Sequence, residues 1–376
     1  HYYTSQEIFD METERVFRTQ WLYAGHVSQI PDTGNFFVAR LATESLIITR
    51  DADHRVRAFF NVCRHRGSQL CPEGSSGKKK RFVCPYHNWS FSLDGKLLGS
   101  PGSPDGTDFN YADWSLHEAD VDVLYGSIYV HLGRAPIQSL REQLGERLVH
   151  DDWQLLDAER AKVIREQRYP VNANWKLVLE NNLECYHCAG SHPELSVACD
   201  YEGFYIERDG TVRDSERKQN PGHFPLREGM KTFSMDGDWV CKKRFGTPQD
   251  EGFSASFILF PMYAAIGYWA DHAVHLHVNP IDKDTTEVVA QWLVHEDAVE
   301  GTDYDVDTVS AVFDATNRED VALIEANQRG VVSDRFVAGP NSTTREHGLQ
   351  KALTAYLELM EADPADQTSS ENGAAL

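Results

Sequence analysis

Two short segments near the start of the chain each combine one cysteine with one histidine. One residue separates Cys63 from His65, and 18 residues later two residues separate Cys84 from His87. Glycine and proline in these segments indicate loops between strands. Two thiolates and two imidazoles can hold a zinc ion. They can also hold a [2Fe–2S] cluster in which two histidines replace two cysteines on one iron.

The spacing favours the cluster. Zinc-binding loops usually carry a Cys-x2–4-Cys pair, whereas each loop here offers one cysteine and one histidine and could bridge both irons. The pattern CRHRG followed by CPYHNWSF resembles the Rieske iron–sulfur domain. The resemblance implies that Cys63, His65, Cys84 and His87 hold a cluster that passes one electron at a time. Structural zinc is the alternative, and Cys71 is predicted to be a core thiol.

A second group of possible metal ligands lies in the segment NANWKLVLENNLECYHCAGSHPEL. Its apolar spacing predicts a helix over residues 173–188. On a helix, Glu184 and His187 would lie on the same side because they are three residues apart. Gly190 would end the helix and let His192 approach. Two histidines alone are a weak signal, since buried histidines are common in cores.

An acid near the C-terminus strengthens the prediction of a metal site. Residues 303–328 are predicted to form a long helix, and Asp320 lies on its apolar stripe. A carboxylate facing a core must be paired or bind metal. Two histidines and one carboxylate are the facial triad of non-haem Fe(II) oxygenases, which leaves positions open for dioxygen. A buried salt bridge is the alternative for Asp320.

Together these motifs resemble the catalytic α subunits of Rieske non-haem iron oxygenases over nearly the whole chain. By that resemblance, His187, His192 and Asp320 hold one mononuclear Fe(II) per subunit. Glu184 would carry electrons from the Rieske cluster of a neighbouring subunit, which implies a homotrimer. The resemblance also implies that the electrons come from NADH through a separate reductase component. This chain has no G-x-G-x-x-G motif for a nucleotide cofactor, so it is not expected to accept hydride directly.

The segment ENNLECYHCAGSHPEL resembles the same region in one branch of that family. This branch acts on quaternary ammonium compounds and includes glycine betaine monooxygenase and stachydrine demethylase. The implied reaction is hydroxylation of an N-methyl group with O2, followed by release of formaldehyde. Choline or carnitine oxidation and oxygenation of an aromatic substrate are the alternatives within enzymes. An electron carrier with a degenerate second domain, and a lipid-transfer type binding protein, are the alternatives outside them.

A quaternary cation has no N–H to donate, so aromatic faces are expected to bind it. The region between the two iron motifs is rich in aromatic residues, of which most are expected to be core. The predicted pocket residues are Trp239, Phe260, Tyr263, Tyr268 and Trp269. His275, His277 or an arginine could bind a substrate carboxylate.

Cys185 and Cys188 flank His187 as a Cys-x2-Cys pair, which taken alone could suggest zinc. They are predicted to be packing thiols. The chain has seven cysteines, an odd number that does not suit a disulfide scaffold. This usage is typical of a reducing compartment, so we expect a cytoplasmic protein.

The elements that must position these groups suggest an α+β protein. Thr4 and Glu7 form a possible capping box before a helix over residues 5–19. Short alternating runs then predict antiparallel strands (FFVARL, SLIITR, RVRAFF and GSIYVHL), with an exposed loop at 73–80. Residues 134–160 are predicted to be a helical connection, and two half-buried strands are predicted at 272–278 and 286–295.

We therefore expect an N-terminal helix (1–20) that packs on the catalytic domain, an all-β Rieske domain (21–140), a catalytic iron domain (141–360) and a flexible tail (361–376). The resemblance implies that the catalytic domain is a helix-grip fold, with an antiparallel sheet and a long C-terminal helix. The net charge of −22 argues against binding to nucleic acid or to anionic membranes. No apolar stretch is long enough to span a membrane.

Overall fold

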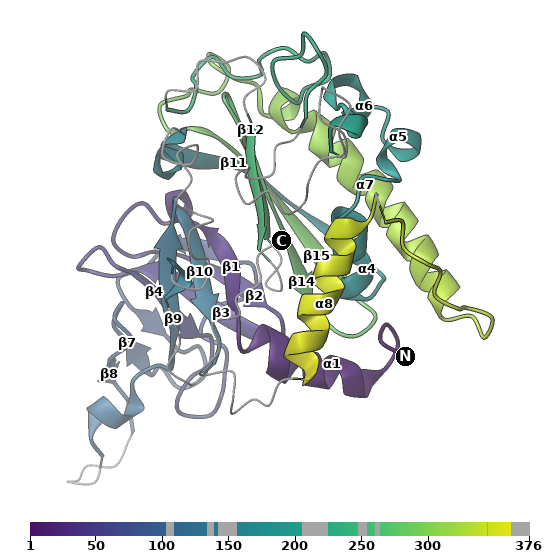
Figure 1. Ribbon diagram of the computed structural model, residues 1–376. Helices are drawn as coiled ribbons and strands as arrows, with labels where there is room; N and C mark the ends of the chain where they lie inside the picture. Colours follow the sequence, from purple (N-terminus) through teal and green to yellow (C-terminus); the bar gives the residue numbers. More distant parts are fainter. Residues whose placement is uncertain are drawn as a thin grey trace. The chain divides into compact units, whose positions relative to one another are not determined.

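The computed structural model describes residues 1–102, 109–133, 139–141, 156–204, 225–246, 254–259, 264–343 and 345–361 (Figure 1). The chain forms two compact units. Arg18–Arg134 is called the β unit here, and His1–Phe17 with Ala135–Leu376 is called the mixed unit. Most of the predicted helical connection over 134–160 lies outside the described residues. Among the described helices, none is long and apolar enough to cross a membrane.

The β unit contains a seven-stranded antiparallel sheet in the order β1-β10-β9-β4-β3-β2-β5 and a three-stranded sheet in the order β6-β7-β8. The four predicted alternating runs are strands, as expected. The predicted loop at 73–80 is exposed but contains β5, which pairs with the edge of β2. The strands are β1 Trp21–His26, β2 Asn35–Leu41, β3 Glu44–Arg50, β4 Val56–Phe60, β5 Ser76–Lys78, β6 Phe82–Val83, β7 Ser90–Phe91, β8 Leu97–Gly99, β9 Glu118–Leu124 and β10 Ser127–His131.

The core of the β unit surrounds the two cysteine loops. Phe36, Phe59, Phe82 and Phe91 are almost completely buried in one cluster that also contains Cys63 and Cys84. Such close packing holds the cysteine of each loop in a fixed position. Cys71 belongs to the same cluster as a free thiol, which confirms the prediction that it is a core residue.

The mixed unit has a five-stranded antiparallel sheet in the order β11-β15-β14-β13-β12. Its helix α7, over Val306–Val331, confirms the predicted long helix. The N-cap of α7 is Asp305, whose side chain accepts the Thr308 N–H. Both predicted strands are present as β14 and β15. The strands are β11 Ala161–Val171, β12 Ser254–Leu259, β13 Ala264–Trp269, β14 Ala273–Pro280 and β15 Thr286–His295. Short 3-10 helices lie at Val27–Gln29, Tyr111–Trp114, Ala158–Arg160 and Tyr201–Phe204.

One face of the mixed-unit sheet lies toward α7. Arg165 and Tyr169 of β11 bond to Asp307 and Asp314 of α7, at 2.7 and 2.6 Å. Side chains alternate between the two faces of a strand, and directly paired residues share a face. The register pairs Arg165 with Trp292, so Trp292 also faces α7. The other face therefore carries the intervening residues of each strand.

The N-terminal helix belongs to the mixed unit. It runs as α1 over Gln6–Glu12 and continues as a π-helix over Thr13–Phe17. The N-cap is Ser5, whose hydroxyl accepts the Ile8 N–H, so the predicted capping box at Thr4 and Glu7 is wrong by one residue. A hydroxyl one residue further on is equally able to cap a helix.

A buried carboxylate joins this N-terminal helix to two others. Glu12 is fully buried and accepts from the Trp175 indole at 2.8 Å, the Lys176 ammonium at 2.5 Å and the Tyr356 hydroxyl at 2.6 Å. Trp175 and Lys176 begin α4, over Trp175–Asn182, and Tyr356 lies in α8, over His347–Glu361. Three donors satisfy the charge that burial removes from water.

Candidate metal centres

The two cysteine loops of the β unit have the same backbone construction. The Cys63 N–H donates to the Ser68 carbonyl at 2.8 Å, and the Cys84 N–H donates to the Trp89 carbonyl at 2.8 Å. Each cysteine carbonyl in turn accepts from the residue four positions on. Those residues, Gly67 and Asn88, have φ of 73° and 59°. Glycine and asparagine are the residues that tolerate this left-handed conformation.

This construction directs backbone N–H groups at the sulfur atoms. The N–H groups of Tyr86 and His87 bond to the Cys84 sulfur, and they outweigh burial and lower its pKa. Burial raises the pKa of the neighbouring Cys63 thiol, although the N–H groups of His65 and Arg66 oppose this. Such N–H groups stabilise thiolates, which are the form that binds metal. The residues present therefore fit an iron–sulfur cluster.

The two histidine rings lie next to each other. The His65 and His87 ring centroids are 4.7 Å apart, and His65 stacks on Trp89 at 4.9 Å with an angle of 5°. Both cysteines are buried, whereas His65 is exposed and His87 is half-buried. Buried thiolates and accessible imidazoles suit a centre that accepts and passes electrons at its histidine side.

The mixed unit brings the three predicted iron ligands together. Asp320 Oδ1 lies 3.3 Å from His187 Nε2 and 3.2 Å from His192 Nε2. The His192 side chain is 1% exposed, and its Nε2 has no hydrogen-bond partner. A buried nitrogen with no hydrogen bond, facing a carboxylate and a second imidazole, fits a metal ion.

Each of these histidines also has a carboxylate on its other nitrogen. Glu184 Oε1 lies 2.6 Å from His187 Nδ1, and Glu319 Oε2 lies 2.8 Å from His192 Nδ1. An ionised carboxylate only accepts, so each Nδ1 carries a proton and each Nε2 is left to face a metal. Asn181 Nδ2 donates to Asp320 Oδ1 at 3.1 Å and orients this ligand.

Protonation of the triad follows from these contacts. Burial would lower the pKa of His187, but hydrogen bonds to Asp320 and Glu184 raise it to about 9. Burial would also lower the pKa of His192, but the nearby carboxylates of Asp320 and Glu319 raise it. Burial would raise the pKa of Asp320, and the two imidazoles lower it instead. A divalent metal would take the place of protons at the Nε2 atoms.

The predicted helix over 173–188 is shorter in the structure. α4 covers only Trp175–Asn182, and the short helices α5 (Cys188–Ser191) and α6 (Leu195–Ala198) follow a turn. Glu184 Oε2 accepts the backbone N–H groups of Tyr186 and His187 in this turn. An acidic side chain that captures nearby N–H groups competes with a helix. Glu184 and His187 thus meet through a turn rather than along a helix.

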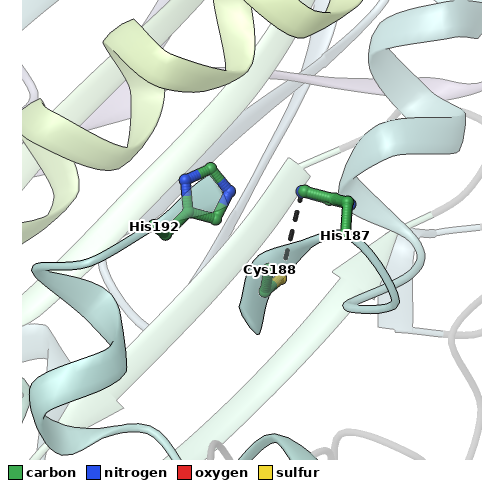
Figure 2. Close-up of side chains that lie close together, drawn as sticks. All are labelled: His187, Cys188 and His192. Carbon is green, nitrogen blue, oxygen red and sulfur yellow. Dashed lines mark hydrogen bonds between the residues drawn. The ribbon is translucent and has the colours of Figure 1, made fainter. Parts of the chain in front are cut away.

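The prediction that Cys185 and Cys188 are packing thiols is wrong, because the structure joins them in a disulfide. Figure 2 shows Cys188 beside His187 and His192. Its sulfur lies 3.9 Å from His187 Nε2, so it could be considered a third ligand in place of Asp320. A disulfide sulfur carries no negative charge, whereas the Asp320 carboxylate reaches both imidazoles. Asp320 is therefore the better ligand in this state.

Glu319 was not predicted as a site residue. It follows Arg318 and precedes Asp320, but it lies off the apolar stripe of α7 because adjacent helical residues point about 100° apart. The signal in the sequence that could have indicated Glu319 is its position as a second acid directly before the predicted ligand Asp320.

We predict that Glu319→Gln weakens iron binding at the mononuclear site by about 10- to 100-fold, because the imidazole loses its charged partner. Iron retention against a chelator would measure this, with Glu325→Gln on the same helix as the control. An unchanged affinity in Glu319→Gln would show that its contact with His192 has no effect on the metal.

The structure separates the predicted pocket aromatics. Trp269 packs against Phe233 at 5.2 Å and Phe313 of α7 at 5.4 Å, on the α7 side of the sheet. Tyr268 points to the opposite face, where its hydroxyl lies 3.3 Å from His275 Nε2. One pocket on the α7 side can thus include Trp269 but not Tyr268.

The remaining predicted pocket residues are less informative. The Arg244 guanidinium already covers the Trp239 ring at 4.4 Å. Phe260 and Tyr263 lie outside the described residues. His275 pairs with Gln291 and His277 with Val289, which places both histidines on the face away from α7 and Asp320. Neither is positioned to bind a substrate carboxylate beside the iron ligands.

Comparison with known families agrees with both metal centres. Residues 20–110 match the family described as the Rieske [2Fe-2S] domain, and residues 158–362 match the catalytic domain of the ring-hydroxylating α subunit. The glycine betaine monooxygenase oxygenase subunit of Pseudomonas aeruginosa (strain UCBPP-PA14) is 36% identical, over 96% of this chain and 88% of its own length.

More distant relatives have the same architecture. The carnitine monooxygenase oxygenase subunit of Escherichia coli (strain K12) is 26% identical, over 93% of this chain and 89% of its own length. The crystal structure of a quaternary ammonium Rieske monooxygenase in complex with an inhibitor has a TM-score of 0.76, with 21% identity, and covers 96% of this chain and 94% of its own. Naphthalene 1,2-dioxygenase from Rhodococcus sp. has a TM-score of 0.69, with 25% identity and the same coverage.

A Rieske [2Fe–2S] centre in the β unit and a mononuclear iron centre in the mixed unit are the two cofactors of one enzyme family. Both family matches, and a relative that matches nearly the whole chain, lead to one conclusion. The chain belongs to the Rieske non-haem iron oxygenases, as an α subunit.

Proposed function

We propose that this chain is the terminal oxygenase of a quaternary ammonium monooxygenase, and that it removes an N-methyl group from a substrate of the glycine betaine or proline betaine type. The proposal of O2 chemistry rests on the close approach of the His187, His192 and Asp320 side chains, which can bind one iron ion. The 36% identity to glycine betaine monooxygenase subunits supports the substrate class. Relatives that oxidise carnitine or choline are 25–26% identical, so these reactions are the alternatives.

In the proposed reaction a quaternary N-methylammonium compound, O2, two electrons and two protons give the tertiary ammonium compound with one methyl group fewer, formaldehyde and water. One methyl C–H is replaced by C–OH, and the resulting N-hydroxymethyl group breaks its C–N bond to leave as formaldehyde. When bound, the cluster supplies single electrons and the iron supplies O2 activation. The protein positions the substrate and keeps water out.

Residues next to the triad hold its imidazole rings in orientations that suit metal binding. Glu184 and Glu319 fix the rings of His187 and His192 through their Nδ1 atoms. Asp320 completes a set of three ligands, and a facial triad of this kind would leave coordination positions for O2. Fixed ligand rings reduce the reorganisation that the reaction needs.

Aromatic residues near the triad suit a cationic substrate. Phe313 lies seven residues before Asp320 on α7, so the two share one face of the helix at about 10 Å along its axis. Phe233 and Trp269 pack against Phe313. We propose that this aromatic cluster forms the wall beyond the iron site, where a methylated ammonium group would be attracted to ring faces.

Electrons are proposed to arrive through Glu184 from a Rieske centre of a neighbouring subunit in a homotrimer. Its carboxylate already bonds to the His187 imidazole and to two backbone N–H groups, so it is held in one orientation. A separate reductase, supplied by NADH, would reduce the Rieske centre.

A single-turnover experiment tests the proposed function. Iron-replete protein is reduced chemically and mixed with O2 and glycine betaine, stachydrine, choline or carnitine in turn. We predict formaldehyde from one of the two betaines, at up to about one equivalent per mononuclear iron. Formaldehyde, aldehyde and trimethylamine are assayed separately, because each identifies one reaction.

The other outcomes are equally informative. Aldehyde from choline or trimethylamine from carnitine would replace demethylation by one of the alternatives. Absence of any product, although the Rieske centre reoxidises, would reject the quaternary ammonium substrates. A cis-diol from an aromatic compound, without formaldehyde, would support ring oxygenation instead.

A further inference from the structure

The disulfide between Cys185 and Cys188 encloses an iron ligand within its loop. His187 lies between the two cysteines in the sequence. The Cys188 sulfur, His187 and His192 each have a possible ligand atom within 4.8 Å of the others, as Figure 2 shows. The triad is thus next to a sulfur that is bonded to another sulfur and carries no charge.

Reduction would change the ligand set of this site. A free Cys188 would be a thiolate donor 3.9 Å from His187 Nε2 and within 4.8 Å of His192, and the Asp320 carboxylate contacts the same two imidazoles. Two imidazoles, one thiolate and one carboxylate form a closed tetrahedral set of the kind that zinc prefers. The open positions that O2 chemistry needs would then be lost.

We propose that the Cys185–Cys188 disulfide is a redox switch of metal selectivity, and that its reduction turns the open iron site into a closed zinc site with Cys188 as an additional ligand. The oxidised pair keeps the sulfur out of the metal's coordination. This inference concerns the metal site alone and is independent of the substrate.

The burial of the two cysteines indicates how the switch would be reduced. Cys188 is 5% exposed, whereas Cys185 is half-buried. A thiolate of an external dithiol attacks the Cys185 sulfur, the S–S bond breaks, and Cys188 leaves as a thiolate. The second thiol of the reagent then displaces Cys185, so that the dithiol becomes a disulfide and two electrons enter the protein. Hydrogen peroxide would reverse the change by taking two electrons and two protons to form two waters.

Two other cysteines of the mixed unit serve as a contrast. Burial raises the pKa of the Cys199 thiol to about 12 and that of Cys241 to about 11. Neither belongs to a group of metal ligands among the described residues. They resist ionisation and remain packing thiols, so a reducing reagent has nothing to change at either.

The test uses two variants that both lack the disulfide but differ in which sulfur remains. Cys185→Ser leaves Cys188 free, and Cys188→Ser removes it. The mononuclear metal is removed with a chelator while the Rieske cluster is kept, and zinc is added. X-ray absorption at the zinc edge then detects any sulfur ligand without interference from the cluster iron.

We expect a zinc–sulfur distance of about 2.3 Å in reduced wild type and in Cys185→Ser, and only nitrogen and oxygen ligands in oxidised wild type and in Cys188→Ser. Zinc should also be retained about tenfold or more strongly by Cys185→Ser than by Cys188→Ser. Loss of the disulfide alone would affect both variants equally.

Two results would overturn the proposal. One is a zinc site without sulfur in Cys185→Ser. The other is alkylation of all seven cysteines in acid-quenched, air-oxidised protein before any reductant is added, where five free thiols are expected.

Discussion

Glu184→Gln protein is expected to bind both metal centres and yet to turn over about 100-fold more slowly or worse. Gln has the same shape and can still accept a hydrogen bond from His187 Nδ1, where Glu184 now lies at 2.6 Å. It has no charge, and its NH2 group cannot replace the oxygen that accepts two backbone N–H groups. Because His187 loses its charged partner, iron binding should weaken as in Glu319→Gln, so iron is supplied in excess and the iron content is measured before the rate.

The rate of electron transfer separates a bridge from a purely structural residue. Chemically reduced protein is mixed with O2 and substrate, and reoxidation of the Rieske cluster is followed by its visible absorption. We expect slow reoxidation in Glu184→Gln and wild-type reoxidation in Glu358→Gln, where the same change is made at an exposed position of α8. Wild-type reoxidation in Glu184→Gln, with product formed, would remove Glu184 from the electron path.

The β unit could be predicted well because its signals are local. Each cysteine loop closes on itself through backbone bonds between Cys63 and Ser68 and between Cys84 and Trp89. A short stretch of sequence therefore contains nearly all the information needed to form a loop. The strands are also predictable locally, because short runs rich in β-branched and aromatic residues, such as FFVARL and SLIITR, are typical of strands, although most residues of both runs are buried and burial does not alternate.

The turn before His187 could not be predicted from the same kind of pattern. Apolar residues continue past Asn182 with helical spacing, and this spacing predicts that Tyr186 lies on the apolar face. In the structure Tyr186 is 62% exposed. The carboxylate of Glu184 accepts backbone N–H groups that would otherwise form helical hydrogen bonds. The spacing of apolar residues in the sequence does not reveal this competing hydrogen bond.

Contacts between segments that lie far apart in the sequence could not be predicted either. Glu319 reaches His192 over 127 residues of sequence, and only the packing of α7 against the turn brings them together. The odd cysteine count argued correctly against a disulfide scaffold, since five cysteines are free. It did not exclude one local disulfide, because the number of cysteines does not say how close any two of them lie in the structure.

Asp320→Ala is expected to lose the mononuclear iron and keep the cluster, so that iron falls from about three to about two per chain. Asp320 is the only charged atom donor of the triad, and both Nε2 atoms lie within 3.3 Å of its Oδ1. Without it, two neutral imidazoles hold a divalent ion weakly. Iron analysis measures the loss, and an unchanged Rieske absorption shows that the β unit is intact.

Asp314→Ala is the matched control for this prediction. Asp314 lies on the same helix, and its carboxylate bonds to Tyr169 and Arg318 rather than to the triad. It should retain about three irons per chain. Full iron in Asp320→Ala would mean that another group completes the site, and a reduced Cys188 is the candidate because it lies within 4.8 Å of both histidines. Adding Cys188→Ser to Asp320→Ala would then decide between them, because only a thiolate ligand would make the second change release the metal.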